Sequence, residues 1–194
     1  PSRKASKEYA NKKVLVVVES WSEKQKNPVG FVKKIIGPSK DHNTEIESIL
    51  FDSGFDSGFS KKAIEETLKI SSIISNEDIS SRTDMRGVNT FTIDPLDAKD
   101  YDDALSVEEI NSNLWRVGVH IADVSHYVSE GGAIDSDALK RGTSVYLVDR
   151  VIPMLPEFLS NDLCSLKPNV DRLSFSVIFD INDCAEVINY SINK

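Results

Sequence analysis

The chain has 194 residues, of which 40% are apolar and 28% charged, and its formal net charge is −8. This composition is typical of a globular protein, and with 8% aromatic residues and nine glycines it excludes a disordered or collagen-like chain. No apolar stretch approaches the roughly 18 residues that a transmembrane helix needs, so no membrane span is predicted.

The charge distribution and the cysteines bear on the binding partners and the cellular location of the protein. Residues 1–40 hold ten Lys or Arg against three Glu, a net charge of +7, so residues 41–194 carry −15. A basic segment can follow nucleic-acid phosphates, whereas the acidic remainder would repel them unless bound cations reverse the local charge. Cys164 and Cys184 show no metal-binding spacing and are interpreted as small buried apolar residues, which fits a reducing, cytoplasmic location.

The first elements along the chain indicate part of a small β-barrel. Strands are predicted at "KVLVVVESW" (13–21) and "NPVGFVKKIIG" (27–37). Because two antiparallel strands are not stable alone in water, we expect sequence upstream of these residues to complete the barrel. A helix is predicted within "DHNTEIESILFDSGF" (41–55), with Asn43 or Thr44 as its N-cap.

The next segment is predicted to connect two domains. The near-duplication "FDSGFDSGFS" (51–60) indicates a turn-rich stretch that buries one or two phenylalanines. Next, "KKAIEETLKISSII" (61–74) has the apolar spacing of an amphipathic helix. A polar linker, "SNEDISSRTDMRG" (75–87), follows, and we place the domain boundary near residue 80.

The remaining residues are rich in predicted strands. One helix is predicted at "AIDSDALKRG" (133–142), with Gly142 as its C-terminal stop, and a short helical turn at "PEFLSNDLCSL" (156–166). Strands joined by loops, with few helices, indicate an α+β fold and not a regular βαβ alternation. The predicted strands are "NTFTID" (89–94), "DALSVEEI" (103–110), "LWRVGVHIA" (114–122), "TSVYLV" (143–148), "RLSFSVIFDI" (172–181) and "AEVINYSI" (185–192).

The stretch "DPLDAKDYDDA" (94–104) places five aspartates in eleven residues. Asp94 ends one predicted strand, and Asp100, Asp102 and Asp103 come just before the next. A loop between two core strands can fold back, so that these four carboxylates converge. Hard oxygen ligands of this kind suit Mg²⁺ or Mn²⁺.

A calcium loop of the EF-hand type is excluded for this stretch. Such a loop needs glycine at its sixth position and glutamate at its twelfth. Counted from Asp94, these positions hold Lys99 and Leu105; counted from Asp100, they hold Leu105 and Asn111.

Two alternatives stay open on spacing alone: a solvated acidic loop and a magnesium site. Asp97 is expected to be a solvated residue in either case. Two metal ions can activate water and stabilise the leaving oxygen during attack on a phosphodiester, without a histidine base. The histidines His42, His120 and His126 share no spacing and are interpreted as structural.

Four blocks of the sequence, taken together and in this order, resemble a known family. They are "TFTIDPLDAKDYDDALS", "VGVHIADVSHYV", "RGTSVYLVDRVIPMLPEFLSNDLCSL" and "DRLSFSVIF". Between about Arg82 and Phe179 they resemble the catalytic domain of the ribonuclease R / ribonuclease II (RNB) exoribonucleases, nearer to the ribonuclease R members. The segment "VVVESWSEKQKNPVGFVKKIIGPSKDHNTEIESILFDSGF" is similar to the end of the second cold-shock (OB-type) domain and its connector.

The resemblance implies a domain organisation for the chain. Residues 1–50 would be the C-terminal part of a cold-shock domain with an OB-type β-barrel, and residues 51–80 a connector with an amphipathic helix. Residues 81–194 would be the strand-rich N-terminal part of the RNB catalytic domain. The expected fold class is therefore α+β, with a partial OB-type barrel followed by a truncated RNB domain.

The resemblance also implies an activity. It implies a processive, Mg²⁺-dependent hydrolysis of RNA from the 3′ end that releases nucleoside 5′-monophosphates. The aspartates of the family's catalytic metal site fall on Asp94, Asp100, Asp102 and Asp103, with Mn²⁺ as an alternative to Mg²⁺. Loss of Asp102 is expected to abolish cleavage and to leave RNA binding largely intact. The family's aromatic contact to the RNA near its 3′ end falls on Tyr146.

Further expectations concern partners and extent. The resemblance implies single-stranded RNA and RNA 3′ ends as partners, contacts of a longer parent protein with the ribosome or RNA-decay machinery, and no membrane or obligate protein partner. We expect this chain alone to have little or no activity, because positioning supplies much of phosphoryl-transfer catalysis. The alternative is an RNA-binding module with a non-catalytic acidic scaffold; a structural acidic domain that contacts basic proteins would explain only the charge.

Overall fold

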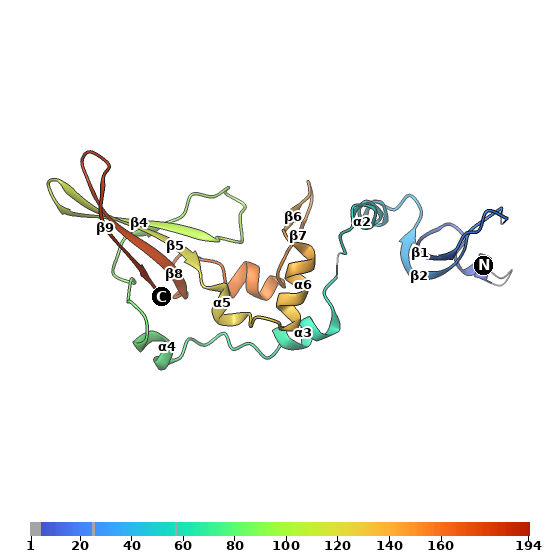
Figure 1. The fold of residues 1–194 in the computed structure, drawn as a ribbon, viewed down its shortest axis with the longest axis horizontal. Helices are drawn as coiled ribbons and strands as arrows, with labels where there is room; N and C mark the ends of the chain where they lie inside the picture. Colours follow the sequence, from blue (N-terminus) through green and yellow to red (C-terminus); the bar gives the residue numbers. More distant parts are fainter. Residues whose placement is uncertain (1–4, 25, 57) are drawn as a thin grey trace. The chain divides into compact units, whose positions relative to one another are not determined.

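The computed structural model describes residues 5–24, 26–56 and 58–194, in two compact units (Figure 1). The first unit ends at Gly58 and the second begins at Phe59. The domain boundaries near residues 50 and 80 stay predictions. Part of the basic N-terminal segment, residues 1–4, lies outside the described residues, as does Ser57 of the phenylalanine repeat.

The first unit is built on a two-stranded antiparallel sheet. Its strands are rich in β-branched residues, which favour extended backbone. Three register shifts interrupt the pairing, the first between Lys13 and Val14. Val18 and Phe31 are exposed, as expected for strands that share a barrel with further sequence. The elements of this unit are α1 (Ala5–Glu8), β1 (Lys12–Ser20), β2 (Val29–Pro38) and α2 (His42–Asp52).

The N-cap of α2 differs from the sequence-based prediction. The predicted caps, Asn43 and Thr44, both lie inside the helix, and the cap is Asp41. One Asp41 carboxylate oxygen accepts hydrogen bonds from the Thr44 backbone N–H and hydroxyl, both at 3.0 Å. Thr44 is buried instead, and its Oγ1 would lie 2.2 Å from a Cβ added at Gly37. The prediction was wrong because it did not consider Asp41, which lies directly before the first helical residue and is of a type strongly preferred at the N-cap.

The second unit contains a five-stranded antiparallel sheet in the order β3-β4-β5-β8-β9. The predicted strand at 89–94 shortens to the two residues of β3, because Pro95 cannot donate to a ladder and the chain leaves the sheet. With the helices below, this sheet confirms the predicted α+β fold class. The strands are β3 (Thr90–Phe91), β4 (Asp103–Asn111), β5 (Leu114–Ala122), β8 (Ser174–Asn182) and β9 (Val187–Asn193).

A second, two-stranded ribbon contains Tyr146. The predicted strand at 143–148 is present only as β6 (Val145–Tyr146), which pairs with β7 (Val151–Ile152). The sequence analysis did not predict β7. The Leu147 N–H donates to the Arg150 carbonyl at 2.8 Å and closes the turn between the two strands.

The helices of the second unit follow the sequence pattern in part. The helix predicted at 61–74 ends at Thr67, and Ser71 then accepts from the Ile73 N–H, a local contact that competes with helix. A short helix in the expected linker was not predicted, although Ser75 and Asp78 form a capping box there. Gly142 ends its helix at φ 71°, as predicted. The helices are α3 (Lys61–Thr67), α4 (Asn76–Ser80), α5 (Val124–Tyr127), α6 (Ala133–Arg141) and the π-helix η1 (Leu159–Leu163).

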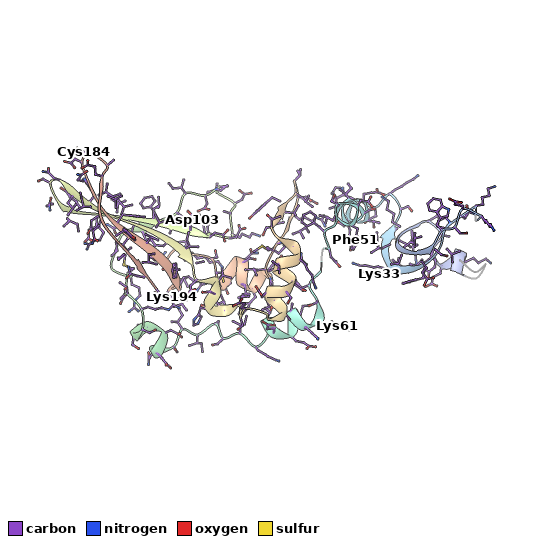
Figure 2. The ribbon with its side chains drawn as sticks, in the orientation of Figure 1. Lys33, Phe51, Lys61, Asp103, Cys184 and Lys194 are labelled. Carbon is purple, nitrogen blue, oxygen red and sulfur yellow. The ribbon has the colours of Figure 1, made fainter. Side chains whose placement is uncertain are left out.

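The core of the second unit lies among α3, α6 and η1, beside the end of β5. The cysteines differ from one another in position. Cys164 is buried in this core, and burial raises its pKa to about 12, whereas Cys184 is exposed at the outer end of the β8–β9 hairpin (Figure 2). The interpretation of Cys184 as buried is wrong. The core residues are Ala63, Ala122, Ile134, Ala138, Leu155, Leu159, Leu163 and Cys164. In the described ranges no helix is long and apolar enough to cross a membrane.

Truncation of the core at Leu159 is expected to destabilise the second unit. Leu159 has 0% exposure, so Leu159→Ala leaves a cavity and lowers the free energy of unfolding by about 2–5 kcal/mol. Leu139, on α6, is 82% exposed, and Leu139→Ala is expected to change the free energy of unfolding by about 0.5 kcal/mol or less. Urea denaturation followed by Trp115 fluorescence in a Trp21→Phe background measures both, and equal effects would contradict the core assignment.

Candidate functional site

The acidic loop, residues 94–103, joins two paired strands. Phe91 of β3 lies opposite Leu105 of β4, and the chain leaves this pairing before it reaches Asp94. The Asp102 carbonyl accepts from the Ala122 N–H at 3.0 Å. The end of the loop at Asp102 is therefore attached to β5, directly before β4 begins.

Asp103 begins β4 and lies opposite Ile121 of β5, at the end of the sheet where the loop attaches (Figure 2). Asp94 and Asp102 are also solvent-exposed, and Asp100 is partly buried. Asp102 and Asp103 therefore lie at one end of the sheet, and all four predicted ligand residues are at least partly exposed to solvent.

The electrostatics of Asp102 show that the four aspartates act on one another. The pKa of Asp102 is raised, first by desolvation of its carboxyl and then by the charges of Asp100, Asp103 and Asp94. Asp97 is exposed and is not among the groups that shift this pKa. Repulsion of this kind favours a bound cation, since opposite charge relieves it.

Tyr146 contacts the acidic loop from the β6–β7 ribbon. Its hydroxyl donates to a carboxylate oxygen of Asp100 at 2.5 Å across 46 residues of chain. This hydrogen bond first, and then burial and the charges of Asp100 and Asp102, raise the Tyr146 pKa to about 12. The ring is 63% exposed, so its face is accessible to a ligand. The structure thus joins Tyr146 to Asp100, and it places Asp94, Asp100 and Asp103 near enough to Asp102 for their charges to act on its carboxyl.

The donor chemistry of the cluster suits Mg²⁺ or Mn²⁺, since four carboxylates supply hard, negatively charged oxygens. Across residues 5–24, 26–56 and 58–194, however, no group of three or more His, Cys, Asp or Glu already converges on a point that a metal ion could occupy. Like charges without a cation hold one another apart. We expect the four carboxylates to draw closer when a cation binds.

The histidines lie outside this cluster. His120, on β5, is buried between two hydroxyls, with Nδ1 at 2.8 Å from Ser176 Oγ and Nε2 at 2.9 Å from Ser106 Oγ. Burial lowers its pKa, so it is neutral near pH 7. Its structural interpretation agrees with this position. His126 Nδ1 lies 3.8 Å from Asp78 Oδ1.

The sequence analysis missed the residues that hold the acidic loop. Ser165 is fully buried and makes hydrogen bonds to the loop backbone on both sides of Asp100. No signal in the sequence separates this serine from other serines, since its role depends on the distant chain that it contacts.

Comparison with known proteins identifies the two parts of the chain. The family model described as RNB domain matches residues 82–194, and the model described as Dis3-like cold-shock domain 2 (CSD2) matches residues 2–54. The chain is 42% identical over 165 residues to ribonuclease R 1 of Lactococcus lactis, and the matched region covers 85% of this chain and 20% of that relative. It is 42% identical over 184 residues to ribonuclease R of Thermotoga maritima, and that matched region covers 94% of this chain and 26% of the relative.

A solved structure shares the fold. Mycoplasma genitalium RNase R in complex with double-stranded RNA superposes with a TM-score of 0.85 at 28% identity, over 94% of this chain and 32% of that chain. The chain therefore spans a fifth to a third of the length of these relatives. The RNB model matches more than half of the residues, and the two relatives are ribonuclease R proteins, which confirms the resemblance seen in the sequence. The chain belongs to the RNB domain family.

Proposed function

We propose that the full-length protein is a hydrolytic exoribonuclease that degrades single-stranded RNA processively from its 3′ end and releases nucleoside 5′-monophosphates. We further propose Mg²⁺, or Mn²⁺ in its place, as its cofactor. Membership of the RNB domain family supports the reaction class, and the RNA bound by the Mycoplasma genitalium relative supports RNA as the ligand.

The observation that carries this proposal is the match of the RNB domain model to residues 82–194, which include the acidic loop. After desolvation of the Asp102 carboxyl, the charges of Asp94, Asp100 and Asp103 raise the pKa of Asp102, so the four carboxylates lie near one another. A bound cation relieves such repulsion. We therefore assign these four residues as metal ligands.

The chain's own residues would divide the work at this site. When bound, Mg²⁺ supplies an activated water and stabilises the leaving oxygen of the scissile phosphodiester. Asp94, Asp100, Asp102 and Asp103 hold the cation. The Tyr146 hydroxyl orients Asp100, and its exposed ring offers a stacking surface that is tolerant of base identity.

An RNA-degradation assay of the full-length protein tests the proposal. With single-stranded RNA labelled at its 5′ end and Mg²⁺ present, we expect stepwise shortening to a short limit product. RNA labelled at its 3′ end should release a labelled mononucleotide first. Internal fragments would indicate an endonuclease, and unchanged RNA would contradict the proposed reaction.

A second candidate is an RNA-binding module whose acidic part is not catalytic. The absence of a converged ligand set in the part of the chain that the structure describes favours it. It predicts that RNA binding resides in residues 1–80 and does not respond to Mg²⁺. A salt and Mg²⁺ titration of RNA binding, run beside the degradation assay, separates the two candidates.

We expect the 194-residue chain by itself to have little or no exoribonuclease activity. It spans 20–32% of its relatives' length, and positioning of the RNA accounts for a large part of the rate of phosphoryl transfer. The same assay with the purified chain measures this. Mononucleotide release at a rate near that of the full-length protein would show that the chain holds a complete site.

Two substitutions of Tyr146 separate the roles of its hydroxyl and its ring. Tyr146→Phe removes the hydrogen bond to Asp100, and we expect kcat to fall about 10-fold with KM changed less than about 2-fold. Tyr146→Ala also removes the stacking surface and is expected to weaken RNA binding by about 1–3 kcal/mol. Steady-state kinetics of the full-length variants measure both; identical KM values for the two variants would contradict the stacking role.

A further inference from the structure

The middle of the acidic loop is held by a distant part of the chain. Ser165 Oγ accepts from the Tyr101 backbone N–H at 3.0 Å and donates to the Lys99 carbonyl at 2.8 Å. The next residue, Leu166, donates its N–H to the Tyr101 carbonyl at 2.8 Å. One fully buried hydroxyl therefore fixes the backbone immediately before and after Asp100.

These bonds continue to Asp102. Its carbonyl accepts from the Ala122 N–H at 3.0 Å, so the backbone is held at the Lys99 carbonyl, at both the N–H and the carbonyl of Tyr101, and at the Asp102 carbonyl. Two aspartates that are two residues apart on a fixed backbone have a fixed spacing between their Cβ atoms. The remaining freedom of Asp100 is restricted further by the Tyr146 hydroxyl.

Arg172 in turn holds the segment that carries Ser165. Its Nε donates to the Ser165 carbonyl at 3.1 Å and to the Asp162 carbonyl at 3.0 Å, and its Nη2 donates to an Asp162 carboxylate oxygen. Asp162 lies in the π-helix η1, a rare backbone form that is frequent at functional sites. The end of η1 and the acidic loop are thereby joined into one hydrogen-bonded unit.

We propose that Ser165 is a positioning residue for the metal site: it fixes the backbone around Asp100, so that the carboxylates of Asp100 and Asp102 need only side-chain rotation to meet a divalent cation. This inference rests on the proposed function. Four carboxylates that repel one another would otherwise move apart, and outer residues that orient metal ligands commonly account for a 10–100-fold effect on metal affinity. The role differs from general packing because it predicts a change in metal binding without a change in RNA binding.

The test compares two buried serines of the second unit in the full-length protein. Ser165→Ala removes the contacts to the loop, whereas Ser176→Ala is a matched control, because Ser176 is also buried but bonds to His120 and Ser174. Binding of Mn²⁺ is measured by the electron paramagnetic resonance signal of the free ion. RNA hydrolysis is measured against Mg²⁺ concentration on the same samples.

We expect Ser165→Ala to weaken Mn²⁺ binding about 10-fold or more and to raise the Mg²⁺ concentration for half-maximal hydrolysis by a similar factor, with the RNA KM within about 2-fold. Ser176→Ala should change none of these by more than about 2-fold. Wild-type Mn²⁺ affinity in a folded Ser165→Ala variant would overturn the inference, as would an equal loss in Ser176→Ala.

A second variant covers the case in which Ser165→Ala does not fold. Arg172→Lys keeps the charge but removes the Nε donor to the Ser165 carbonyl, and we expect it to weaken Mn²⁺ binding about 3-fold or more. Unchanged Mn²⁺ affinity in this variant would then overturn the inference. If the wild-type protein neither binds Mn²⁺ nor hydrolyses RNA, the proposed function fails and this inference with it. If the wild-type protein does both and the variants bind Mn²⁺ equally well, this inference alone fails.

Discussion

Replacement of Asp102 by asparagine in the full-length protein is expected to lower the rate of RNA hydrolysis on the order of 10³-fold, while RNA affinity stays within a few-fold. Desolvation of its carboxyl and then the charges of Asp100, Asp103 and Asp94 raise the pKa of Asp102, so its carboxylate lies within the electrostatic reach of the other three. Asparagine has nearly the same shape but lacks the negative charge that a divalent cation needs. Single-turnover hydrolysis and RNA binding, measured on the same preparation, give the two quantities.

The acidic loop contains its own control for this substitution. Asp97 is exposed and does not contribute to the pKa shift of Asp102, so Asp97→Asn is expected to leave hydrolysis within about 2-fold. Both variants make the same chemical change in one loop. Unchanged turnover in Asp102→Asn, or an equal loss in Asp97→Asn, would rule out the assigned role of Asp102.

Removal of divalent cations is the second change with a large expected effect. Addition of EDTA should reduce hydrolysis by the wild-type protein to background, and Mg²⁺ in excess should restore it, because without a cation the four carboxylates repel the phosphodiester and nothing stabilises its leaving oxygen. Activity that persists in EDTA would contradict a metal-dependent reaction.

Cation removal should also change the stability of the protein in a way that depends on Asp102. Its folded-state pKa is raised, so the stability that it contributes is present below its unfolded pKa and is lost as pH rises through its folded pKa. Near neutral pH without metal, the charged carboxylate therefore destabilises the fold. Asp102→Asn removes this charge and is expected to raise Tm in EDTA at about pH 7 and to have little effect at about pH 3.

In Mg²⁺ we expect the wild-type protein to have a higher Tm than Asp102→Asn, the reverse of the order in EDTA. A cation that binds only the folded state stabilises the wild-type protein, whereas the variant binds it weakly and gains little. Thermal unfolding of both proteins in EDTA and in Mg²⁺ tests this. Equal Mg²⁺ shifts in the two proteins would indicate a solvated acidic loop and not a metal site.

The sheet of the second unit was predictable because its strands carry a local signal. The residues of β4 and β5 alternate in part between apolar and polar, as do those of β8 and β9, and their bounds differ from the predictions by two residues at most. The prediction at 89–94 was too long, since the strand ends at Phe91 and Pro95 cannot donate a hydrogen bond that would continue the ladder. Cys184 was misjudged because its position is set by a turn, in which Asn182 accepts from its N–H.

The acidic loop was predictable for a different reason. Aspartates concentrated between two strands leave few arrangements, and the charge of Asp94 acts on the carboxyl of Asp102 in the folded chain. The contact of Tyr146 with Asp100 spans 46 residues and depends on the placement of the β6–β7 ribbon. Likewise, Ser165 acts through backbone atoms of Lys99 and Tyr101, which carry no sequence signal of their own. Local pattern and the family resemblance therefore pointed to the four aspartates as candidate ligands, and only the folded chain showed which contacts hold the loop.

The most direct test of the central claim is an anomalous diffraction map of the full-length protein crystallised with Mn²⁺. We predict a manganese peak within bonding distance of carboxylate oxygens from at least three of Asp94, Asp100, Asp102 and Asp103, and the loss of that peak in Asp102→Asn. A map without a manganese peak at these carboxylates, from crystals that bind Mn²⁺ elsewhere, would contradict the account.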